Sequence, residues 1–259
     1  MFEALGRSLL KSFSAPLMMS TMFCEALKTA WTERGKSDKL VWNVIFQQIL
    51  FTGVEAMKVV TIIALLLGFV TIIQTVTQLP KVGGEALIGK MLVLVVVREL
   101  GPMLTAFIII GRSGTAIAIE IGNMIVNHEI EAIEMMGINP LRFIVLPRLI
   151  GVTIAVACLS LYFTIVALFG GFLFSKFFTF YPFPVFLDHL GSAFGVWDLT
   201  VNIMKCTLFG VIVAAICCYR GFTVKFSSTE VPQVTTKAVV GSIYVCFLIN
   251  AVITAFFYI

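Results

Sequence analysis

Two adjacent charges, Arg98 and Glu99, stand in the middle of an apolar run that reads LVVVRELGPML from residue 94 to residue 104. A charged side chain at the centre of a membrane span costs about 2.5 to 3.5 kcal/mol on an insertion scale, so such residues normally face a cavity or a charged partner. Successive residues of a helix point about 100° apart, so each charge should find its own partner. The pair predicts either a binding site or a set of ion pairs that only locks helix packing or a dimer seam.

The residues that follow this pair, Gly101 and Pro102, predict a distorted helix. Proline has no amide hydrogen to donate to the Arg98 carbonyl, and Gly101 allows close approach and bending. A third buried charge, Lys205, lies about two turns after Asp198 in a later apolar run. It has two candidate partners, Asp198 and Glu99, and of these we expect it to extend toward Asp198.

A second polar feature is the stretch EIGNMIVNHEIEAIEMMGINPLRFIVLPR, residues 120–148, in a chain with only 14 acidic residues. It predicts a helix at about 115–138 whose acidic and sulfur-bearing end suits a groove on a partner protein. A solvated loop helix is the alternative. The residues assigned to this docking role are Glu120, Glu129, Glu131, Glu134, Met135, Met136 and Gly137.

The composition indicates a polytopic membrane protein, with 59% hydrophobic residues, 12% charged residues and a mean hydropathy of +1.05 over 259 residues. The long apolar runs show no alternation with a period of two, so the spans should be helices rather than strands. We therefore predict an all-α integral membrane protein with about five transmembrane helices. The predicted spans are 52–79, 86–112, 144–172, 197–219 and 238–258.

The positive charges predict the orientation, because cytoplasmic loops are enriched in Lys and Arg. A cytoplasmic N-terminus leaves only Lys81, Lys90 and Lys176 on the outer face. It places twelve positive residues inside, namely Arg7, Lys11, Lys28, Arg34, Lys36, Lys39, Arg112, Arg142, Arg148, Arg220, Lys225 and Lys237. The C-terminus is then periplasmic. Residues 1–51 are expected to form interfacial amphipathic helices, or else an irregular packed segment, ahead of a transmembrane domain at 52–259.

Several kinds of chemistry are not expected. The six cysteines and two histidines lack metal-ligand spacing, so we predict neither a metal site nor a cofactor. The stretch GEALIGKM, residues 84–91, resembles a phosphate-binding loop but has Met91 where a Ser or Thr hydroxyl should reach magnesium. The chain is therefore not expected to be an enzyme or to bind nucleic acid, and any ATP hydrolysis belongs to a separate subunit.

Four segments resemble the signature of the MlaE (YrbE-type) permease family, the membrane subunits of ABC transporters associated with Mce proteins. They are RELGP at 98–102, GRSGTAIAIEIG at 111–122, EAIEMMGINPL at 131–141 and PR at 147–148. Gln74, the pattern of Asp198, Asn202 and Lys205, and TTKAVV at 235–240 also fall where this family has similar residues.

The resemblance implies a homodimeric permease of a bacterial inner membrane. It would move phospholipid or a related lipid to or from an Mce-domain protein on the outer face, powered by a cytoplasmic ABC ATPase docked on the acidic helix. Lipid binding and gating would involve Gln74, Arg98, Glu99, Gly101, Pro102 and Lys205. Two other functions stay open: an ion-coupled secondary transporter that uses the buried charges as a relay, and a membrane scaffold that does not transport.

Overall fold

The computed structural model describes residues 38–84, 87–177, 182–225 and 227–258. Every regular element in these ranges is helical, and five helices among them are long and apolar enough to cross a membrane. This confirms the predicted all-α integral membrane class. Residues 1–37, where most of the predicted interfacial segment falls, lie outside the described residues. The five candidate spans are Val41–Val82, Ile88–Val126, Leu141–Phe174, Val196–Phe222 and Glu230–Phe257.

Each of the first three spans contains α-helical pieces and π-helical segments, which carry η labels. In a π-helical segment each backbone N–H bonds to the carbonyl five residues earlier. The first comprises α2 (Asp38–Ile49), η1 (Leu50–Val54), α3 (Met57–Gln78) and the 3₁₀ turn η2 (Pro80–Val82). The second comprises α4 (Ile88–Leu92), η4 (Val93–Leu100), α5 (Gly101–Ile109), η5 (Ile110–Gly114) and α6 (Thr115–Val126). After α7 (Glu129–Met135) come η6 (Leu141–Val145), α8 (Leu146–Ile165), η7 (Val166–Gly170), α9 (Gly171–Ser175), α10 (Phe183–Ala193), α11 (Val196–Phe222) and α12 (Glu230–Tyr258).

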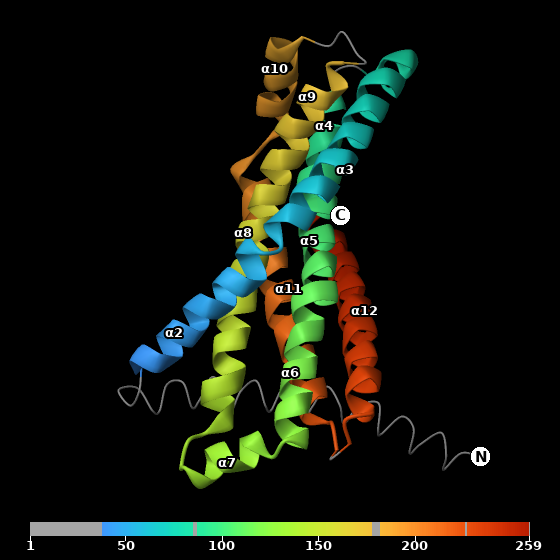
Figure 1. Ribbon diagram of the computed structural model, residues 1–259. Coiled ribbons are helices and arrows are strands. Elements are labelled where there is room, and N and C mark those ends of the chain that lie inside the picture. Colours follow the sequence, from blue (N-terminus) through green and yellow to red (C-terminus); the bar gives the residue numbers. More distant parts are fainter. Residues whose placement is uncertain (1–37, 85–86, 178–181, 226, 259) are drawn as a thin grey trace, which may run out of the picture.

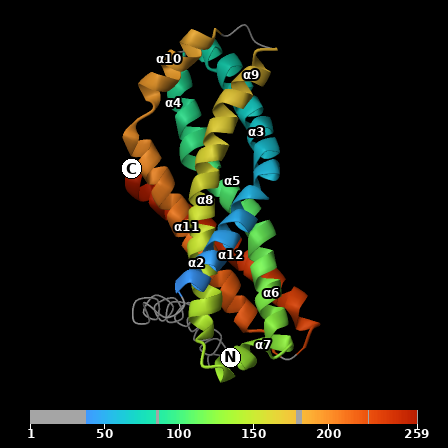
Figure 2. The ribbon, with the colours of Figure 1, turned by 60° about the vertical axis from the view of Figure 1, so that its left-hand side comes forward.

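The helices form an elongated bundle (Figure 1). Helix α7 and the connection from α11 to α12 lie at one end, while α10 and the α3–α4 connection lie at the other. Helix α2 leaves the axis of α3 and runs beside α8 in both views (Figure 2). Helix α11 packs against α5, α6, α8 and α12. It is the central element, since 61% of its most apolar stretch is buried against 22% for α12.

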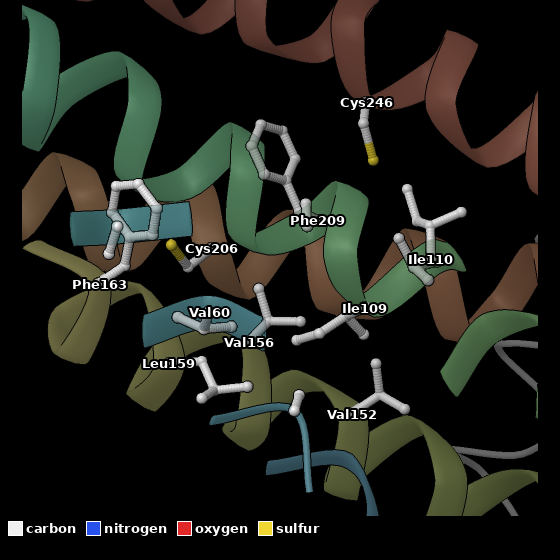
Figure 3. Packing of buried hydrophobic residues seen from close by; sticks show 14 of the residues in the cluster. Val60, Ile109, Ile110, Val152, Val156, Leu159, Phe163, Cys206, Phe209 and Cys246 are labelled. Carbon is white, nitrogen blue, oxygen red and sulfur yellow. The ribbon is translucent and has the colours of Figure 1, made fainter. Parts of the chain in front are cut away.

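The buried core joins α3, α5, α8, α11 and α12 (Figure 3). Phe163 of α8 and Phe209 of α11 are among its largest fully buried side chains, and Val60 and Ile109 are fully buried in the same cluster. In a lipid environment the hydrophobic effect does not bring helices together, so this close packing itself supplies much of the attraction between them.

The first candidate span begins at Val41, earlier than the predicted residue 52. No proline interrupts residues 38–54, so the helical chain of α2 and η1 continues to the turn at residues 55–56. Helix α2 buries Val41 and Ile45 beside Leu146 of α8. Its opposite face exposes Trp42 and Phe46, at 68% and 62%. The interfacial placement of residues 38–51 stays a prediction, because α2 buries apolar side chains on one side and exposes apolar side chains on another.

The predicted helix at about 115–138 is two elements in the structure. Residues 115–126 form α6, which continues the second span without a break, and only α7 is a separate helix. The break comes at His128, whose backbone has a positive φ of 59° and cannot continue a right-handed helix. Gly111 and Gly114, near the predicted span end at residue 112, lie inside the π-helical segment η5.

Glycine at position 68 allows α3 to approach the third span closely. A Cβ atom added to Gly68 would overlap the backbone of Ala167, and Gly171 faces the Gly68 backbone in the same way. Small residues at such crossings let helix backbones touch in membranes. Gly53, by contrast, has only the Ala155 Cβ near its own Cβ direction, at 3.9 Å.

We predict that Gly68→Ala lowers the yield of folded protein and its melting temperature, because the two backbones must separate to admit a methyl group. A cost of about 1 to 3 kcal/mol is typical of such overpacking. Thermal unfolding of the detergent-purified protein, followed by size-exclusion fluorescence, provides the measurement. Gly53→Ala is the matched control and should melt at or above the wild-type temperature, since alanine favours a helix over glycine. Equal behaviour of the two variants would contradict the crossing.

Candidate functional site

Four charges from η4 and α11 meet as two ion pairs. The Nη2 atom of Arg98 lies 2.6 Å from Oδ1 of Asp198, and Nζ of Lys205 lies 3.0 Å from Oε1 of Glu99. The expectation of separate partners for Arg98 and Glu99 is therefore confirmed. The expectation that Lys205 extends to Asp198 is wrong. Asp198 is already occupied by Arg98 and by the Gly195 amide, which donates to its Oδ2 atom at 3.0 Å.

The ammonium group of Lys205 has all three of its N–H donors satisfied although the residue is fully buried. It donates to the Arg98 carbonyl oxygen at 3.0 Å, to Glu99 Oε1 at 3.0 Å and to Thr254 Oγ1 at 2.9 Å. A lysine offers three donors and no acceptor. This match explains how a charge can stay in the interior without extending to the membrane surface.

The irregular backbone around Pro102 leaves backbone carbonyl groups that need hydrogen-bond donors from other helices. The Gly101 amide donates to the Val96 carbonyl, five residues back, and Pro102 has no amide to donate. Two carbonyls, of Val97 and Arg98, are met by α11 side chains instead: Asn202 Nδ2 donates to Val97 O at 2.6 Å, and Lys205 donates to Arg98 O. Asp198, Asn202 and Lys205 are spaced i, i+4, i+7, so they lie on one face of α11, and this face contacts the distorted segment.

Helices α12 and α8 complete the network with residues that the sequence analysis did not single out. Asn250 Nδ2 donates to Glu99 Oε2 at 2.7 Å, and Thr254 Oγ1 donates to Glu99 Oε1 at 2.9 Å. Ser160 of α8 donates to the Asn202 Oδ1 atom at 3.1 Å. Asn250 and Thr254 are polar residues four apart within an apolar span, a spacing that puts them on one helix face and was a usable signal.

The accessibility of the four charges is uneven. The side chains of Asp198 and Lys205 are 4% and 0% exposed, whereas those of Arg98 and Glu99 are 26% and 29% exposed. The cluster is neutral as a whole. Asp198 and Lys205 form its buried side, and the Arg98 guanidinium lies on its partly exposed side. Gln74 is not part of the cluster, because its side chain lies on an exposed face of α3.

The acidic docking residues divide between two elements. Glu129, Glu131 and Glu134 are exposed on α7, where Glu131 Oε2 lies 3.1 Å from His128 Nδ1. Met135 and Met136 follow, 84% and 66% exposed, and Gly137 ends the turn with a positive φ of 75°. Glu120 lies apart from them on α6.

The carboxylate of Glu120 meets a buried arginine rather than α7. Its Oε1 atom lies 2.8 Å from Nη2 of Arg148 on α8. On the other face of α7, Ile130 and Ile133 are partly buried against the core. The helix is therefore amphipathic, and its acidic face is open.

We predict that Lys205→Met and Glu99→Gln each destabilise the protein but that the double variant is less unstable than the sum of the two. Removing one partner leaves a buried charge unpaired, at about 3 to 5 kcal/mol, and removing both charges relieves that penalty. Melting temperatures of the four proteins in one detergent form the double-mutant cycle. Strictly additive effects would contradict the ion pair.

Comparisons with known proteins agree with this architecture. The family model described as Permease MlaE matches residues 45–256. A probable ABC transporter permease protein of Rickettsia prowazekii is 31% identical over 219 residues, covering 85% of each chain. The intermembrane phospholipid transport system permease protein MlaE of Haemophilus influenzae is 28% identical over 213 residues, covering 82% of each chain.

A chloroplastic relative extends the comparison beyond bacteria. The protein TRIGALACTOSYLDIACYLGLYCEROL 1 of Arabidopsis thaliana is 29% identical over 220 residues, which cover 85% of this chain and 63% of that one. The matched region contains both the charge cluster and α7. The chain belongs to the MlaE permease family of transporter membrane subunits.

Proposed function

We propose that this chain is the permease subunit of an ABC transporter that moves phospholipid between a bacterial inner membrane and an Mce-domain protein on the outer face. The observation that carries the proposal is the partly exposed Arg98 guanidinium at a π-helical segment within a candidate membrane span. Arginine is suited to phosphate because its planar fork donates two parallel hydrogen bonds. The relative named for phospholipid transport supports the choice of substrate class.

In this proposal a lipid phosphate competes with Asp198 for Arg98. The Lys205–Glu99 pair, which α12 holds through Asn250 and Thr254, keeps η4 in place while that exchange occurs. Gly101 lies against Thr164 and Asn202, so its lack of a side chain lets the helices approach beside Pro102, which has no backbone amide to donate. These residues position Arg98 rather than contact the lipid.

The proposal includes two protein partners and a second copy of the chain. Helix α7 would seat its open acidic face in a groove of a cytoplasmic ABC ATPase, which places the N-terminus inside and the C-terminus in the periplasm. Five helices make a small bundle for a lipid-sized path, and α12 exposes Val240, Tyr244, Val252 and Phe256. A homodimer would cover part of this apolar face. Native mass spectrometry of the purified complex measures the copy number.

We predict that Arg98→Lys slows phospholipid transfer about tenfold while the complex still assembles. Lysine keeps the charge but loses the paired donors, and one charge-assisted hydrogen bond is worth about 1.5 kcal/mol or more. Transfer is measured between liposomes with the reconstituted, ATPase-bound complex. Arg112→Lys is the matched control, because Arg112 forms its own ion pair with Glu55 outside the cluster. Wild-type transfer by Arg98→Lys would assign the charges to a structural role, and transfer driven by an ion gradient without ATP would favour the secondary transporter.

We predict that the double reversal Glu131→Lys and Glu134→Lys releases the ATPase and uncouples ATP hydrolysis from transfer, with no loss of membrane insertion. Exposed charge pairs are individually weak, so two reversals are needed for a clear effect. Co-purification of the ATPase and lipid-stimulated ATP hydrolysis are the measurements. Asp188→Lys, an exposed reversal on α10 near the opposite end of the bundle, is the control. Unchanged ATPase binding by the double variant would indicate that α7 is a solvated loop helix.

A further inference from the structure

A cavity of about 210 Å³ lies between the end of α11 and the beginning of α12. Its lining is almost wholly polar, with Val234 the one apolar contributor among Arg220, Thr223, Lys225, Glu230, Gln233, Val234 and Lys237. Three cations face one carboxylate, which leaves two positive charges in excess. A water molecule occupies about 30 Å³ in the liquid, so the space suits a small polar group and is too small for an acyl chain.

The cationic side chains that line this cavity are not paired with acidic side chains of the described residues. Among the described residues, no ion pair joins Arg220, Lys225 or Lys237 to an acidic side chain. The single carboxylate is turned toward the backbone, since Glu230 Oε2 accepts a hydrogen bond from the Lys225 amide at 3.0 Å. The Arg220 Nε atom is buried without a hydrogen-bond partner. The cavity therefore presents unmatched donors and positive charge to whatever enters it.

The depth of the cavity points to a lipid headgroup. Helix α11 has 27 residues and is about 40 Å long, close to the full thickness of a bilayer with its headgroup regions. Arg220 stands in its last turn, and Lys237 lies about 10 Å along α12 from Glu230. The cations are therefore at the level where long basic side chains meet phosphates, and basic pockets between helix ends are a known way of holding anionic lipids.

This cavity is separate from the charge cluster. Lys205 and Arg220 are 15 residues apart on α11, which is about 22 Å along the helix. Val224 and Val231, on either side of the connection, contact Gly122 of α6, so the cavity lies at the end of the bundle that carries α7. A ligand here would join α11 to α12, the two helices that supply Lys205, Asn250 and Thr254 to the cluster.

We propose that the cavity at the α11–α12 junction binds the phosphate of an anionic phospholipid in the leaflet on the α7 side. The site is distinct from that of the transported lipid, so the inference does not depend on the proposed function. An anionic headgroup is favoured over a zwitterionic one because the excess charge is positive and the one carboxylate is engaged with the backbone.

The test measures bound lipid by native mass spectrometry of the full-length protein in a neutral detergent, with phosphatidylglycerol and phosphatidylcholine added in equal amounts. The variant Lys225→Gln with Lys237→Gln removes two exposed charges and keeps the partly buried Arg220, so we expect the fold to be retained. Each basic residue near a membrane surface contributes about fivefold to anionic lipid binding, so the double variant should lose roughly tenfold or more of the preference for phosphatidylglycerol. Raising the salt concentration should weaken the wild-type preference in the same direction.

The matched control is Lys81→Gln with Lys90→Gln, two exposed lysines near the opposite end of the bundle, which should keep the wild-type preference. A wild-type preference in the Lys225 and Lys237 variant would overturn the proposal. Displacement of phosphatidylglycerol by millimolar inorganic phosphate would show a site for free phosphate rather than lipid. Loss of the ATPase subunit from that variant, with lipid preference intact, would show a protein interface instead.

Discussion

The missing amide of Pro102 is the constraint on which the interior of this protein depends. In hydrocarbon an unpaired backbone carbonyl costs several kcal/mol, because water is absent. The segment η4 leaves the carbonyls of Val97 and Arg98 for side-chain donors, and α11 supplies one donor for each, from Asn202 and Lys205. The register of α11 against the second span follows from these two bonds, since a slip of one residue would leave both carbonyls without donors.

The electrostatics of the cluster follow from the same constraint. A buried lysine that serves a carbonyl still needs a counter-charge, which Glu99 provides, and Glu99 is in turn held by Asn250 and Thr254 of α12. Replacing such a network with apolar residues is often neutral for stability, so its presence is weak evidence for a stabilising role. Partial exposure of Arg98 and Glu99 is what the proposed exchange of partners requires, because only an accessible guanidinium can exchange partners.

The sequence predicted the helical class, the five spans and the separate partners of Arg98 and Glu99, since each depends on hydrophobicity or on the cost of a buried charge. It did not predict the partner of Lys205. That choice depended on which carbonyls the π-helical segment left free, a consequence of three-dimensional register. The end of the second span was also missed, because α6 is apolar enough to continue a span and its stop depends on the backbone conformation of His128. Asn250 and Thr254 were detectable as polar residues in an apolar run.

The continuity of the second span bears on how an event at α7 could reach the charge cluster. From Glu99 to Val126 the chain is helical throughout, 28 residues or about 40 Å, and α7 begins three residues later. A displacement of α7 would therefore act on one long helical span. Within this span the backbone hydrogen bonding is irregular at η4 and η5, where we expect it to bend most easily. We expect motion of α7 to act on η4, because the ion pairs of the charge cluster lie there. Coupling between distant sites needs such an element with two arrangements, and the exchange of Arg98 between Asp198 and an anionic ligand would provide them.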